Sequence, residues 1–152
     1  MKASTTPTDP GVVQDFLIAA ALQQLHKIRY YVECVGLHPD TTRDGKPTPL
    51  CYAALKPNLT LIDYYVAKGA DVNSHDAMGM TPLHYAALGG CVVCLSRLIA
   101  EGARINQPNK GGETPLATAI YRSCSEGCAE LLRRHGGVTG EDAVPARRPC
   151  FH

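Results

Sequence analysis

The segment Thr81–Ala87 has the sequence Thr-Pro-Leu-His-Tyr-Ala-Ala, and its first three residues occur twice more in the chain. Thr-Pro-Leu also occupies residues 48–50 and 114–116, so Thr81 lies midway between Thr48 and Thr114. A tripeptide that returns at one fixed interval is typical of stacked structural repeats. Threonine before proline also favours a helix start. Its hydroxyl can accept an unpaired backbone N–H, and proline loses no donor at the first helical position.

Each Thr-Pro-Leu is followed by two helical patterns that end at glycine. In the clearest copy, Gly90 separates the two predicted helices and Gly102 ends the second, as expected of residues that tolerate left-handed backbone. Counted from its own threonine, the final glycine of the last copy, Gly136, comes one position later than Gly69 and Gly102 do. We therefore predict one inserted residue in the last copy, within 123–127.

A weaker copy precedes these three. Residues 12–35 have a helical apolar pattern with a predicted break after Leu22, and a shift by the interval from Thr48 to Thr81 places Gly36 on Gly69. Terminal repeats are expected to be atypical because one of their faces meets water. We predict repeats at 11–40, 41–73, 74–106 and 107–137, with flexible tails at 1–10 and 138–152.

Composition narrows the function. Hydrophobic residues make up 45% of the 152 residues, which is enough for a core, and tryptophan is absent. Lys and Arg total 15 against 14 Asp and Glu, so the net charge is only +1. This near-balance of charge argues against a nucleic-acid-binding protein and gives no attraction to an anionic membrane. Seven cysteines, an odd number, favour reduced thiols. We expect a cytoplasmic monomer, with the nucleus as an alternative location.

The pattern Asp76-x-x-Gly79-x-Thr-Pro-Leu-His84-x-Ala-Ala, with Gly102-Ala103 after the second helix, resembles the ankyrin repeat. The resemblance implies an all-α solenoid of about four helix–loop–helix repeats with projecting β-hairpin loops. It also implies a protein-interaction function without catalysis or a cofactor, and a His84 imidazole that bonds to neighbouring loops. Four departures stand out: Asp15-Phe16-Leu17 for the first Thr-Pro-Leu, Lys46 for Gly79, and Cys51 and Ala117 for His84.

Two chemical alternatives compete with a purely structural role for the cysteines. Cys51 and His84 occupy the same position in consecutive repeats, so a thiol–imidazole pair is one hypothesis, although no orienting carboxylate accompanies it. The second is a zinc-binding or redox-responsive regulator built on Cys91, Cys94, Cys124 and Cys128. We favour small buried cysteines in both cases, and predict no catalytic residue and no metal ligand.

A partner protein is expected on the loop tips and the outward face of each first helix, because side chains there are not needed for stacking. The predicted binding residues are Asp44, Pro47, Leu55, Lys56, Ala77, Met78, Met80, Leu88, Lys110, Glu113, Tyr121 and Arg122, with Gln23 and Gln24 extending the row. The row has an apolar centre and a polar rim, as interfaces commonly do. The partner's identity is not predicted.

Overall fold

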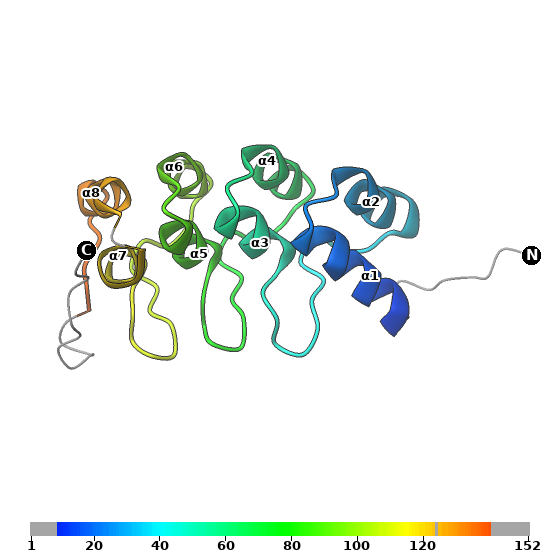
Figure 1. Ribbon diagram of the computed structural model, residues 1–152, viewed down its shortest axis with the longest axis horizontal. Coiled ribbons are helices and arrows are strands. Elements are labelled where there is room, and N and C mark those ends of the chain that lie inside the picture. The colour runs from blue at the N-terminus through cyan, green and yellow to red at the C-terminus, as the bar shows by residue number, and fades with distance from the viewer. Residues whose placement is uncertain (1–8, 124, 141–152) are drawn as a thin grey trace, which may run out of the picture.

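The computed structural model describes residues 9–123 and 125–140. Helix pairs stack side by side along one axis, and loops project from the same side of the stack (Figure 1). The elements are α1 (Pro10–Ala21), α2 (Leu25–Arg29), η1 (Tyr30–Val35), α3 (Pro49–Leu55), α4 (Leu59–Ala67), α5 (Pro82–Gly89), α6 (Val92–Ala100), α7 (Pro115–Thr118), η2 (Ala119–Ser123) and α8 (Glu126–Arg134). The predicted all-α solenoid is confirmed. The loops project as expected, but the described part of the chain contains no β-strand.

Three helices begin at the proline of Thr-Pro-Leu, as predicted. The Thr81 hydroxyl accepts a hydrogen bond from His84 N, and the Thr114 hydroxyl accepts one from Ala117 N. The prediction for Thr48 is wrong, since its side chain makes no capping hydrogen bond within the described residues. Its hydroxyl instead lies 3.3 Å from Cys51 Sγ, to which it donates, and 3.1 Å from Ser74 Oγ.

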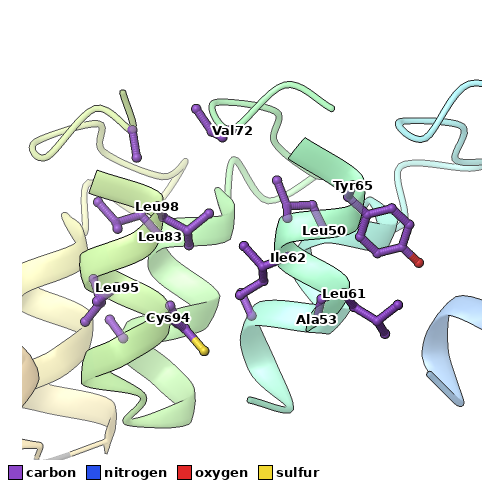
Figure 2. Packing of buried hydrophobic residues seen from close by; sticks show 14 of the residues in the cluster. Leu50, Ala53, Leu61, Ile62, Tyr65, Val72, Leu83, Cys94, Leu95 and Leu98 are labelled. Atoms are coloured by element: carbon purple, nitrogen blue, oxygen red, sulfur yellow. The ribbon is translucent and has the colours of Figure 1, made fainter. Parts of the chain in front are cut away.

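The core lies between the inner helices α3 and α5 and the outer helices α4 and α6. Figure 2 shows Ile62 on the side of α4 that faces the leucines of the next repeat, whereas Leu61 extends to the opposite side; both are buried in the core cluster. Buried alanines at 53–54 and 86–87 keep the inner helices thin. A Cβ added to Gly89 would lie 2.5 Å from the Leu55 carbonyl oxygen, so glycine is needed where α5 approaches α3.

The two ends of the array depart from regular helix. The predicted break after Leu22 is present, since α1 ends at Ala21 and Gln23 has a φ of +55°. In the last repeat, α7 continues into the π-helical turn η2. The turn η2 ends at Ser123, where the range 123–127 predicted to hold the inserted residue begins. Single π-helical turns of this kind occur as local bulges within α-helices.

The ordered array reaches further into both predicted tails than expected. Asp9 caps α1 by accepting a hydrogen bond from Gly11 N at 2.8 Å, and Pro10 is the first residue of that helix. At the other end, Val138 N donates to Asn106 Oδ1 at 2.8 Å, and the Thr114 hydroxyl donates to Val138 O. Residues 1–8 and 141–152 of the predicted tails lie outside the described residues.

Candidate partner-binding surface

Three loop tips, residues 44–46, 77–79 and 110–112, lie in a row. Ala77 N donates to Gly45 O at 2.8 Å, and Lys110 N donates to Met78 O at 2.9 Å. One backbone bond therefore joins each tip to the next. A single bond per pair holds neighbouring tips in register without forming a strand ladder between them. Within the last two loops, Asp76 N donates to Met80 O at 3.2 Å and Asn109 N donates to Glu113 O at 2.9 Å.

The tip of the second repeat turns differently from the other two. Gly79 and Gly112 have φ values of +75° and +76°, which glycine tolerates without strain. Lys46 occupies the equivalent position in the second repeat, and there the left-handed residues are Asp44 and Gly45, at +56° and +68°. The departure at Lys46 is thus accommodated by moving the turn toward the N-terminus.

The bases of the last two loops are held by a polar side chain. Asp76 Oδ1 accepts hydrogen bonds from Met78 N and Met80 N, both at 2.9 Å. Asn109 Oδ1 makes the same pair of bonds to Gly111 N and Glu113 N, at 2.9 and 3.0 Å. These side chains pre-order the loops, because each satisfies two backbone donors that the turn leaves unpaired.

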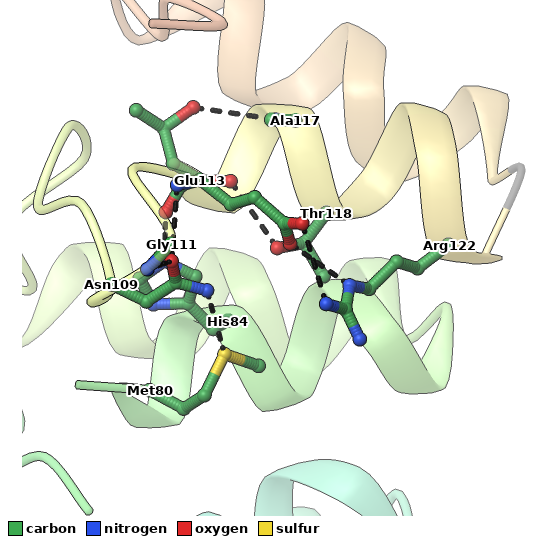
Figure 3. A network of polar contacts seen from close by, with 9 residues as sticks. Met80, His84, Asn109, Gly111, Glu113, Ala117, Thr118 and Arg122 are labelled. Atoms are coloured by element: carbon green, nitrogen blue, oxygen red, sulfur yellow. Dashed lines mark hydrogen bonds and ion pairs between the residues drawn. The ribbon is translucent and has the colours of Figure 1, made fainter. Parts of the chain in front are cut away.

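The His84 imidazole joins its own helix start to the next loop (Figure 3). Nδ1 accepts from Thr81 N at 3.2 Å, and Nε2 lies 2.9 Å from Glu113 O. Since the carbonyl can only accept, Nε2 carries the proton. Nδ1 carries none because it accepts from Thr81 N, so the ring is neutral. Burial lowers the pKa of His84, which favours this neutral form.

Most of the predicted binding residues reach the surface. Met78 is 64% exposed, although it is a large apolar side chain on an ordered loop. The other exposed members of the predicted set are Asp44, Lys56, Ala77, Lys110 and Arg122, and the half-buried members are Gln23, Gln24, Pro47, Leu55, Leu88 and Tyr121.

Two members of the predicted row are buried, and the expectation that they are free for recognition is wrong. Met80 is only 8% exposed, and its sulfur accepts a hydrogen bond from Asn109 Nδ2 at 3.2 Å. Glu113 is 2% exposed, and its carboxylate pairs with Arg122 at 2.8 and 3.3 Å (Figure 3). Both side chains connect parts of the array instead of facing a partner.

Two half-buried tyrosines beside the loops were not among the predicted binding residues. Tyr52 and Tyr85 follow Thr-Pro-Leu at the same register, and the Tyr85 hydroxyl donates to Asp76 Oδ2 at 2.5 Å. Burial raises the pKa of both phenols, Tyr85 more strongly because it also bonds to the carboxylate. The two tyrosines occupy the same position in consecutive repeats, and this repetition in the sequence could have identified them.

The family model described as "Ankyrin repeats (3 copies)" matches residues 16–109 and 50–142, which together span most of the chain. The chain belongs to the ankyrin-repeat family. Ankyrin repeats are generally protein–protein interaction modules, and the family is typically non-enzymatic. The comparison with curated proteins finds no significant match.

Within this ankyrin array, the structure gives Cys51 and His84 separate partners. Both ring nitrogens of His84 bond to Thr81 and Glu113, so neither is directed at the thiol. Burial raises the pKa of Cys51 to about 12, which keeps the sulfur protonated and unreactive. This geometry supports the structural interpretation of both residues.

The later cysteines show the same behaviour where they are described. Cys91 Sγ accepts a hydrogen bond from Cys94 N at 3.1 Å, which caps α6. Burial raises the pKa of Cys94 to about 12 and also raises that of Cys128. Cys124 lies outside the described residues; among those described, no group of three or more His, Cys, Asp or Glu could hold a metal ion. Of the helices in residues 9–123 and 125–140, none is long and apolar enough to cross a membrane.

Proposed function

We propose that this ankyrin array binds a protein partner through its row of loop tips and the adjoining face of the inner helices. The observation that carries the proposal is Met78, which is 64% exposed on a loop whose backbone is bonded on both sides. A large apolar side chain that is mostly exposed contributes little to the array's own packing. Because the loop is already ordered, a partner would lose little binding energy to ordering it.

The proposed interface has Met78 at its centre and other members of the predicted row around it. Leu88 and Tyr121 supply further half-buried contacts, and Asp44, Lys110 and Arg122 form the polar rim. Methionine adapts to irregular surfaces, and tyrosine and arginine are frequent hot spots. Met80 and Glu113 contribute indirectly, by holding the loops in place. A monomeric, cytoplasmic adaptor or inhibitor is the corresponding cellular role.

The test compares two substitutions of similarly exposed apolar residues. Met78→Asp alters the loop tip, and Val93→Asp alters the outer helix α6, where Val93 is 60% exposed. Each variant and the parent chain are used as bait in a cell extract, and the captured proteins are quantified by mass spectrometry. We expect Met78→Asp to lose proteins that the parent and Val93→Asp both retain.

Thermal unfolding of both variants supplies the control for folding, since neither site is buried. Equal capture by all three baits would exclude the loop tips as the binding surface. Loss of capture confined to Val93→Asp would assign binding to the outer helices instead.

A further inference from the structure

The accessible charge of the loop tips is mostly positive. Lys46 and Lys110 are exposed in the tips on either side of Met78, and within residues 9–123 and 125–140 neither forms an ion pair. The acidic residue of the tips, Asp44, is already paired with Arg43 at 3.3 Å. The local surface therefore presents two uncompensated ammonium groups beside one apolar side chain.

The other acidic groups of these loops are turned inward. Asp76 is 8% exposed and accepts bonds from two backbone amides and from the Tyr85 hydroxyl. Glu113 is 2% exposed and is neutralised by Arg122. A ligand at the tips thus meets the lysines but not these carboxylates, although the chain as a whole has a net charge of only +1.

A groove of about 500 Å³ continues the basic surface between the third and fourth loops. Its lining, as far as the structure describes it, includes Lys110, Arg104 and His75, together with one acidic residue, Asp71. Asp71 Oδ1 accepts a hydrogen bond from Asn73 N at 2.9 Å, so part of its charge is already satisfied. Arg104 is exposed and has no ion pair among the described residues.

We propose that the partner segment recognised at the tips is acidic and carries one large apolar residue. This inference rests on the proposed function and specifies the chemistry of the partner. The apolar side chain packs on Met78, and carboxylates on either side of it pair with Lys46 and Lys110. A further carboxylate enters the groove and pairs with Arg104, whose guanidinium can bind it through two parallel bonds.

Charge complementarity of this kind mainly increases the association rate and the specificity, and salt screens it. The acidic partner segment should therefore bind less tightly as ionic strength rises, whereas its apolar contact with Met78 should depend little on salt. A segment with the same apolar residue but lysines in place of the acids should be rejected, because like charges would face each other.

The experiment uses a short fluorescein-labelled peptide with a central leucine flanked by glutamates, and a second peptide with lysine at every glutamate. Fluorescence anisotropy with the full chain measures binding at low and moderate NaCl. We expect only the acidic peptide to bind, with affinity reduced about tenfold by Lys110→Glu or Arg104→Glu. Lys27→Glu, an equal charge change on the exposed face of α2, is the matched control and should change affinity less than about twofold.

Equal binding of both peptides, no binding of the acidic peptide, or an unchanged affinity in Lys110→Glu would overturn the inference. Tighter binding of a single-stranded DNA of matched length would overturn it as well, by assigning the basic surface to nucleic acid. If the acidic peptide fails while the extract still yields partners that depend on Met78, the proposed function stands and only the acidic chemistry is wrong. If both experiments fail, the binding surface itself is wrong.

Discussion

The second and third repeats begin with the same Thr-Pro-Leu but hold their loops differently. In the third repeat, His84 bonds to the loop of the fourth repeat and Asp76 holds its own loop. The second repeat has Cys51 and Arg43 at these positions, and its loop is instead held by the Thr42 hydroxyl, which donates to Lys46 O at 2.9 Å.

A further difference lies at the entrance to each loop. Asn73 Nδ2 donates to Gly102 O at 3.3 Å, and Asn106 Nδ2 donates to Gly136 O at 3.0 Å. Asp40 stands at the position of Asn73 one repeat earlier and has no amide to donate, and its buried Oδ1 has no hydrogen-bond partner among the described residues. One helical scaffold is thus compatible with very different polar bonding. Apolar packing between the repeats forms the array, and the polar side chains determine how each loop is hydrogen-bonded to its neighbours.

The largest expected effect comes from removing the polar bridge of the third repeat. His84→Ala deletes an imidazole that satisfies both Thr81 and Glu113, and should lower the free energy of unfolding by about 2–4 kcal/mol. Cys51→Ala, at the same position of the second repeat, removes a buried sulfur that accepts from the Thr48 hydroxyl, which also lies 3.1 Å from Ser74 Oγ, and should cost about 1 kcal/mol. Urea unfolding followed by circular dichroism measures both. A Cys51→Ala variant as destabilised as His84→Ala would contradict the comparison.

A smaller gain is expected from giving the second repeat the histidine it lacks. Met80 occupies the position of Glu113 one repeat earlier, so an imidazole at position 51 would meet an equivalent carbonyl acceptor. Cys51→His should raise the free energy of unfolding by about 1 kcal/mol relative to the parent chain. The comparison uses urea midpoints at about pH 7.5, where the added imidazole is neutral. A stability at or below that of Cys51→Ala would show that the second loop cannot accept the bridge.

The smallest effect concerns Asp40. Asp40→Asn should add about 0.5–1 kcal/mol near neutral pH, because an amide can donate where the carboxylate oxygen has no partner among the described residues. Burial and the nearby Asp71 charge raise the pKa of Asp40, although Asp71 N and His38 partly oppose this. The folded chain then holds the proton to higher pH than the unfolded chain, so the parent loses stability as pH rises from about 4 through the folded pKa.

The advantage of Asp40→Asn should consequently disappear below about pH 4, where the carboxyl is protonated in both states. Asn73→Asp supplies the reverse exchange in the third repeat and should be destabilising near neutral pH. A constant difference between Asp40→Asn and the parent across the acid range would show that the titration of Asp40 is not involved.

The helical framework could be predicted because its signals are local and periodic. The constant interval between the Thr-Pro-Leu copies located the starts of α3, α5 and α7, and the extra residue of the last repeat lies next to the π-helical turn η2. The exposure of individual loop side chains was predicted less well. Loop residues have no period, so the pattern could not separate Met78, which points outward, from Met80, which is buried two positions later.

The sequence by itself determined the ankyrin stack, since helix starts, glycine ends and alanine faces act within one repeat or at a constant interval. Only the tertiary structure decided which polar and apolar loop side chains remain available to a partner. The contacts of Met80 with Asn109 and of Glu113 with Arg122 show the reason. Whether a loop side chain is buried depends on groups from other loops and helices, and these groups meet only when the repeats are stacked.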